Sequence, residues 1–100
     1  MVDLQTLSES VGAQLLSRGE WLATAESCTG GWVAQSITAI AGSSAWFDRG
    51  FVTYSNAAKQ EMLGVTEATL ERHGAVSEAT ARAMAQGAIA NHVAFFVIDA

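Results

Sequence analysis

Thr24-Ala25-Glu26-Ser27-Cys28-Thr29-Gly30-Gly31-Trp32 is the segment in which a strand-like pattern gives way to a helical one. An apolar run, residues 21–25, precedes it, and apolar residues at helical spacing follow it as far as Ile40. A strand that breaks into small polar residues before a helix presents a side-chain nucleophile beside unpaired backbone N–H groups. The segment therefore predicts a strand-to-helix turn that could carry acyl-transfer chemistry.

The rest of the chain alternates helical and strand patterns around this turn. We predict a three-layer α/β/α domain with a central mixed sheet, incomplete at its C-terminus. Ser43 to Asp48 has no firm assignment. The expected helices are 3–18, 31 to before Gly42, 56–63, 66–73 and 78–90, and the expected strands are 20–24, 49–54 and 93–98.

The last of these strands predicts more sheet than the chain contains. Residues 93–98 show no polar alternation, which is typical of a strand buried on both faces. Such a strand pairs at an edge, is covered by a partner chain, or belongs to a truncated sheet. We favour truncation, because an uncovered apolar edge invites aggregation.

The composition of the chain argues against several classes of protein. The 100 residues carry a formal charge of −5 with five scattered cations, which argues against nucleic-acid binding. No apolar run approaches the roughly 18 residues of a membrane-spanning helix. A single cysteine and the absence of a secretory signal suit the cytoplasm. No His, Cys, Asp or Glu spacing resembles a metal site, so we expect neither metal nor cofactor.

Ser27 is the first candidate for a nucleophile, because it lies at the turn where the backbone amides of Thr29, Gly30 and Gly31 could hold an oxyanion. The alternative interpretation is that Ser27 and Thr29 only cap the following helix. Cys28 is a second candidate, since a helix N-terminus lowers a thiol pKa, although lone cysteines more often pack. The residues alone do not decide between Ser27 and Thr29 for the attack.

The candidate base is Lys59, the only lysine, in the first turn of a short predicted helix where a cation opposes the helix dipole. Next to a serine it could act as general base, while the commonest role of a lysine is a solvated surface charge. Tyr54 could relay a proton or orient Lys59, or could simply end a strand. Glu26 could orient a substrate amide, or form an ion pair with Lys59 or Arg49.

Several blocks of sequence, in order, closely resemble the C-terminal domain of the competence/damage-inducible protein CinA, the nicotinamide-nucleotide amidase family. The likeness runs from about Leu4 to Ala90. The blocks are Ala25-Glu26-Ser27-Cys28-Thr29-Gly30-Gly31, Gly42-Ser43-Ser44, Arg49-Gly50-Phe51-Val52-Thr53-Tyr54-Ser55-Asn56, Lys59, Leu63-Gly64-Val65 and His73-Gly74-Ala75-Val76-Ser77-Glu78.

The resemblance implies a cytoplasmic, metal-free serine–lysine hydrolase that forms homo-oligomers and deamidates nicotinamide mononucleotide to nicotinate mononucleotide and ammonia. Ser27 would attack the amide carbon and Lys59, assisted by Tyr54, would take its proton. Glu26, Thr29, Gly30, Gly31 and Arg49 would bind the substrate or its oxyanion.

Residues 1–100 would be the N-terminal part of a single amidase domain. In the family, the strand that resembles residues 93–98 leads into a glycine loop, and here Asp99-Ala100 replaces its start. The rival hypothesis is a catalytically silent homologue that acts as an oligomeric interaction module. A third, weaker hypothesis is an anion- or nucleotide-binding domain that uses the helix start at Gly30-Gly31.

Overall fold

The computed structural model describes residues 3–90 and 96–99 and has an α/β architecture. The elements, in chain order, are α1 (Leu4–Arg18), β1 (Leu22–Glu26), α2 (Trp32–Thr38), a 3₁₀ turn η1 (Ser43–Ala45), β2 (Phe47–Val52), α3 (Asn56–Leu63), α4 (Glu67–His73), α5 (Glu78–Ala90) and β3 (Phe96–Asp99).

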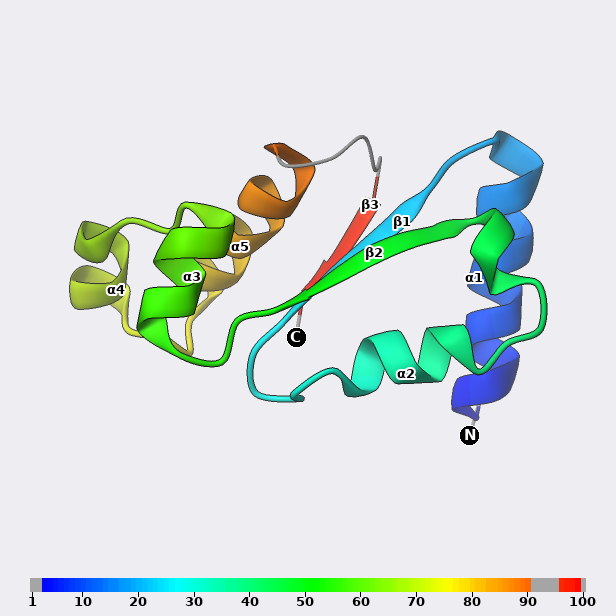
Figure 1. Ribbon diagram of the computed structural model, residues 1–100, viewed down its shortest axis with the longest axis horizontal. Helices are drawn as coiled ribbons and strands as arrows, with labels where there is room; N and C mark the ends of the chain where they lie inside the picture. Colours follow the sequence, from blue (N-terminus) through cyan, green and yellow to red (C-terminus); the bar gives the residue numbers. More distant parts are fainter. Residues whose placement is uncertain (1–2, 91–95, 100) are drawn as a thin grey trace.

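The described sheet is parallel, with β1 in the middle of the order β2-β1-β3. The strand arrows all point toward the end of the molecule where α3 and α4 lie, and α1 stands at the opposite end (Figure 1). The carboxyl ends of β1 and β2 therefore lie side by side, with Glu26 paired to Val52. Crevices at this edge of an open parallel sheet are the usual ligand sites of α/β folds.

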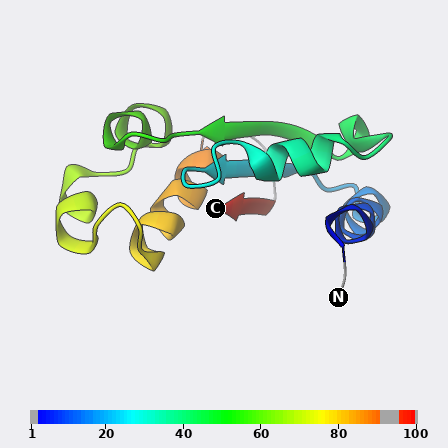
Figure 2. The same ribbon diagram turned by 90° about the horizontal axis from the view of Figure 1, so that it is seen from below.

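Helices cover both faces of the sheet, because a strand buried on both sides needs an apolar layer on each. Figure 2 shows α2 over one face and α5 behind the other. The apolar residues correspondingly form two clusters, one beside α1 and α2 and one beneath α5. The first contains Leu15, Leu22, Ile37 and Trp46; the second contains Ala25, Leu63, Val65, Leu70, Met84 and Ala88.

The predicted α/β class is confirmed, and the predicted helices appear with their caps. Asp3, Ser55 and Thr66 cap α1, α3 and α4 through side-chain oxygens, and Gly19 and Gly64 end helices in the left-handed region. The second helix is shorter than expected and ends at Thr38. Where we expected a mixed sheet, the three described strands all run parallel.

The strands differ in position from the sequence prediction. β1 begins and ends two residues later than the predicted 20–24, and β2 begins and ends two residues earlier than the predicted 49–54. The predicted strand 93–98 is observed from Phe96, at an edge of the described sheet, and residues 93–95 lie outside the described residues. Across residues 3–90 and 96–99, none of the helices has the length and apolar character that crossing a bilayer requires.

Candidate active site

The site is built around the turn from β1 to α2. Two consecutive glycines make this turn tight, since Gly30 has φ 62° and Gly31 has φ 110°. These values lie in the left-handed region that side chains disfavour. The turn is closed by backbone hydrogen bonds from Gly30 N to the Ser27 carbonyl, 3.1 Å, and from Trp32 N to the Thr29 carbonyl, 3.2 Å.

Glu26, the last residue of β1, lies inside this turn and is fully buried. Its carboxylate accepts hydrogen bonds from the Thr29 hydroxyl at 2.8 Å, the Val33 amide at 2.8 Å and the Ala34 amide at 2.9 Å. Burial alone would raise the pKa of this carboxyl, but the donors together, Ala34 first, hold the pKa below its usual range. Glu26 therefore contacts the first turn of α2, in place of the predicted substrate or Lys59.

The nucleophile candidates differ in their hydrogen bonds. The Thr29 hydroxyl donates to Glu26, a carboxylate whose lowered pKa makes it a weak base. Across the described chain the Ser27 hydroxyl has no hydrogen-bond partner, and Ser27 is half-buried. Ser27 is thus the hydroxyl that remains available for attack at this turn.

The backbone N–H groups of the turn fall into two groups, those that already have an acceptor and those that do not. Gly30 N is used by Ser27, and Gly31 N lies against the Glu26 carboxylate. The amides of Cys28 and Thr29 have no acceptor within the part of the chain that the structure describes. Of the predicted oxyanion donors, only Thr29 therefore has an available amide. The amide of Cys28, which was not predicted, is also available.

Lys59 projects from the first turn of α3 and is 1% exposed. Its amine donates to the Tyr54 carbonyl at 3.2 Å. None of the ion pairs within the described residues gives it a carboxylate partner. A buried lysine without a carboxylate contributes little to folding, which distinguishes Lys59 from a solvated surface charge.

The sheet brings Lys59 and Ser27 to the same edge. Ser27 follows β1, and Tyr54 follows the neighbouring strand β2, with Thr53 N bonded to the Glu26 carbonyl at 2.8 Å. Within the described residues Ser27 and Lys59 are not hydrogen bonded to each other, and catalytic hydrogen bonds often tighten only when the substrate binds. The Tyr54 side chain is exposed, and its recorded contact with Lys59 is through the backbone.

Arg49 lies away from this edge. It pairs with Ala23 in the sheet, four residues before Ser27, which corresponds to about 13 Å along a strand. Its guanidinium forms an ion pair with Asp48, Nε to Oδ2 2.6 Å. The predicted substrate-binding Arg49 is therefore not brought to the turn.

A small pocket of about 100 Å³ opens beside the turn. Ser27 and Cys28 form one side, and the α4–α5 loop with the start of α5 forms the other, through Ala75, Val76, Ser77, Ala81 and Met84. The loop is held by two hydroxyls on the Gly74 carbonyl, Thr80 at 2.6 Å and Ser77 at 3.1 Å. A largely apolar, preformed wall thus faces the candidate nucleophile.

The residues of this wall were not among the predicted site residues. Residue type alone does not identify Val76 or Met84 as site residues, because neither carries a reactive group. The sequence signal at this position is the block His73-Gly74-Ala75-Val76-Ser77-Glu78, which resembles the family but predicts no role for these residues.

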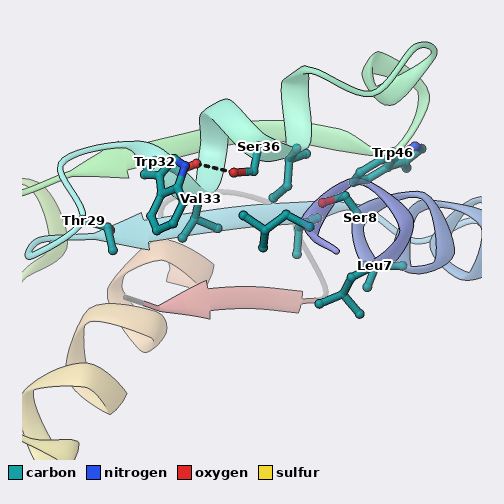
Figure 3. A pocket seen from close by; sticks show the side chains of 11 residues that line it. Leu7, Ser8, Thr29, Trp32, Val33, Ser36 and Trp46 are labelled. Carbon is teal, nitrogen blue, oxygen red and sulfur yellow. Dashed lines mark hydrogen bonds between the residues drawn. The ribbon is translucent and has the colours of Figure 1, made fainter. Parts of the chain in front are cut away.

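A second cavity, of about 290 Å³, lies between α1 and α2. Figure 3 shows Thr29 and Trp32 toward one end of it and Trp46 toward the other, with the Ser36 hydroxyl bonded to the Trp32 carbonyl. Its lining is almost entirely apolar and contains neither Ser27, Tyr54 nor Lys59. Among the site residues, the candidate nucleophile Ser27 therefore lines the smaller pocket and not this cavity.

The third hypothesis, an anion site at the start of α2, is disfavoured by the position of the Glu26 carboxylate. The Val33 and Ala34 amides already bind the carboxylate of Glu26. An external anion at the same place would face a buried negative charge, which is unfavourable.

Comparison with known proteins identifies the family of the chain. The profile of the CinA C-terminal domain matches residues 4–98. The nicotinamide-nucleotide amidohydrolase PncC of Escherichia coli K12 is 64% identical over 87 residues, covering 87% of this chain and 53% of the relative. The PncC of Enterobacter agglomerans is 63% identical over 86 residues, covering 86% and 52%. The chain thus spans about half the length of these curated relatives.

Solved structures show the same fold. The competence/damage inducible protein CihA of Agrobacterium tumefaciens superposes with a TM-score of 0.94 at 47% identity, over 99% of this chain and 60% of that one. A CinA superfamily protein of Escherichia coli superposes with a TM-score of 0.94 at 37% identity, over 97% and 56%. The profile match covers nearly the whole sequence, and the chain belongs to the CinA C-terminal domain family.

Proposed function

We propose that this chain is an amidase that hydrolyses the carboxamide of nicotinamide mononucleotide, releasing ammonia and nicotinate mononucleotide. The substrate is inferred from the relatives, which are named nicotinamide-nucleotide amidohydrolases and are 63% and 64% identical to this chain. The single observation that carries the chemistry is the buried amine of Lys59, which has no carboxylate partner among residues 3–90 and 96–99 and lies at the sheet edge that also holds Ser27.

In the proposed reaction the Ser27 hydroxyl attacks the amide carbon, and the Lys59 amine accepts its proton. The tetrahedral oxyanion is held by the amides of Cys28 and Thr29. The C–N bond then breaks, and Lys59 returns the proton to the leaving ammonia. Water attacks the resulting ester with Lys59 again as base, which frees the carboxylate and regenerates the Ser27 hydroxyl.

The pocket beside Ser27 supports an aromatic amide as substrate. Val76, Ala81 and Met84 offer apolar contacts for a flat pyridine ring while its carboxamide points to the turn. Tyr54, 74% exposed, has its side chain available to contact bound substrate or to assist Lys59. We also propose a cytoplasmic location and assembly into homo-oligomers, with neither metal nor cofactor in the reaction.

The test is ammonia release from nicotinamide mononucleotide by the 100-residue chain, with Ser27→Ala and Lys59→Ala measured beside it. We expect turnover in the parent and a loss of about 100-fold or more in each variant. A folded parent that releases no ammonia would contradict the proposal and would favour the silent homologue.

A further inference from the structure

Glu26 has the geometry of a structural anchor for the reactive turn. It is fully buried at the end of the central strand, directly before Ser27. One carboxylate oxygen, Oε1, accepts from the Thr29 hydroxyl and the Val33 amide, both at 2.8 Å. The other, Oε2, accepts from the Ala34 amide at 2.9 Å.

These bonds hold both ends of the segment that carries Ser27. The Thr53 amide donates a hydrogen bond to the Glu26 carbonyl at 2.8 Å and fixes the backbone of Glu26. The Glu26 carboxylate accepts hydrogen bonds from Thr29 and from the first turn of α2. α2 has no side-chain cap at Gly31, so Glu26 supplies acceptors that a capping residue would normally provide. Ser27 and Cys28 are thus held between two anchored points.

Direct roles in the reaction fit Glu26 poorly. It exposes no surface to a substrate, and three donors already occupy its two oxygens. The same donors lower its pKa, so the carboxylate is a weak proton acceptor.

We propose that Glu26 is a positioning residue for the amidase reaction: its carboxylate sets the orientation of the Ser27 hydroxyl and of the Cys28 and Thr29 amides. The proposal rests on the proposed function for its kinetic consequences. The role requires a carboxylate, because all three partners are donors. A glutamine would turn its own NH₂ toward one backbone N–H, and an aspartate would be one methylene too short.

The decisive variant is Glu26→Gln, which keeps the size of the side chain. Its matched control is Asp3→Asn, because the Asp3 carboxylate makes the same kind of contact at α1, with the Thr6 amide at 2.7 Å and the Thr6 hydroxyl at 3.1 Å. Both variants lose a carboxylate that caps a helix and binds a threonine. Only Glu26 adjoins the reactive turn.

We expect Glu26→Gln to lower kcat by about tenfold or more while KM stays within about twofold, since misplacing a nucleophile costs rate before binding. Asp3→Asn should leave both constants within about twofold of the parent. An unchanged kcat in Glu26→Gln overturns the proposal. So does a rise in KM alone, because that pattern identifies a substrate ligand.

A second readout does not need amidase activity. Cys28, the only cysteine, is exposed at the same turn, so its alkylation by iodoacetamide reports on the turn. Releasing the turn and removing the nearby negative charge both favour reaction, and we expect about threefold faster alkylation in Glu26→Gln and no change in Asp3→Asn. If the parent chain shows no turnover, the proposed function fails, and the alkylation rates still decide the role of Glu26. Equal rates in parent and Glu26→Gln overturn it.

A milder variant covers the case in which Glu26→Gln does not fold. Thr29→Val removes one of the three hydrogen bonds and keeps both amide contacts. We expect it to raise the Cys28 alkylation rate partway, and Thr29→Ser to bring the rate back toward that of the parent. A rate in Thr29→Val equal to that of the parent contradicts the anchoring role.

Discussion

At the scale of single residues, we expect Lys59 to be needed for the reaction but not for the stability of the fold. Its amine is buried with one carbonyl hydrogen bond, an arrangement that stabilises the fold less than an apolar side chain of similar length would. We predict that Lys59→Met abolishes turnover, by about 100-fold or more, while the free energy of unfolding stays equal or rises by about 1 kcal/mol. Urea unfolding and ammonia release measure the two effects.

Gln60→Met is the control for Lys59→Met, because the neighbouring side chain is exposed on the same helix. It should change neither quantity by more than about 0.5 kcal/mol or twofold. A Lys59→Met protein that unfolds far more easily than the parent would mean that Lys59 is a structural residue.

Glu26 makes the stability of the protein depend on pH. Its folded pKa lies below the ordinary value of 4.5, because three hydrogen bonds outweigh the effect of burial. Its contribution is therefore complete above the unfolded pKa and is lost as the pH falls through the folded pKa. We predict that the free energy of unfolding falls less steeply below about pH 4.5 in Glu26→Gln than in the parent.

Asp3 and Glu78 also have lowered pKa values, so they too contribute to the fall in the free energy of unfolding at acidic pH. Both remain in Glu26→Gln, so the difference between the two urea-unfolding curves isolates Glu26. Parallel curves between about pH 5 and pH 3 would contradict the assigned ionisation of Glu26.

At the scale of elements, α3, which carries Lys59, packs against α5, which forms part of the pocket wall. Gly87 of α5 packs so closely on α3 that a Cβ there would lie 1.9 Å from the Leu63 carbonyl oxygen. We predict that Gly87→Ala destabilises the protein by about 2 kcal/mol or more, because backbone atoms cannot move aside. The exposed neighbour Gln86 offers the control, and Gln86→Ala should unfold like the parent in a thermal melt.

The loop between α4 and α5 should affect substrate binding without affecting stability. Val76 lines the pocket beside Ser27, yet it is 83% exposed, so its side chain contributes little to the core. We predict that Val76→Asp raises KM for nicotinamide mononucleotide about fivefold or more, through lost apolar contact and repulsion of the substrate phosphate. The melting temperature should stay within about 2 °C.

Ile89→Asp is the matched control for Val76→Asp, because Ile89 is an exposed apolar residue of α5 outside the pocket lining. It should leave KM unchanged. Equal effects of the two substitutions on KM would exclude the loop as part of the substrate site.

Helices could be predicted closely from the sequence, and strand ends could not. Caps such as Ser55 and Gly64 are local signals, and in the structure they begin and end α3. β1 extends to Glu26, which hydropathy alone would place outside a buried strand. Its burial depends on amides seven and eight residues away, a contact that exists only after the chain has folded back.

The candidate site shows the same division. Ser27 and Lys59 stood out by residue type and position, and the structure places both at the carboxyl edge of the sheet. Glu26 and Arg49 were expected to contact the substrate, but the first caps α2 and the second lies along β2. Which partner a charged side chain takes is decided by strand register and packing, which a single sequence does not specify.

At the scale of the whole molecule, the site is assembled from distant parts of the chain. β1, β2, α3 and the α4–α5 loop each contribute, and the parallel sheet aligns the ends of the first two (Figure 1). The geometry of the site thus depends on the packing of both apolar clusters, which hold the helices on the two faces. We propose that this arrangement makes Ser27 an acyl-accepting nucleophile.

Intact-protein and peptide mass spectrometry of the chain, acid-quenched during turnover of nicotinamide mononucleotide, can detect this acyl group. We expect a nicotinate-mononucleotide acyl group on Ser27, absent in Ser27→Ala. An adduct on Cys28 or Thr29, or ammonia release by Ser27→Ala at the parental rate, would contradict it.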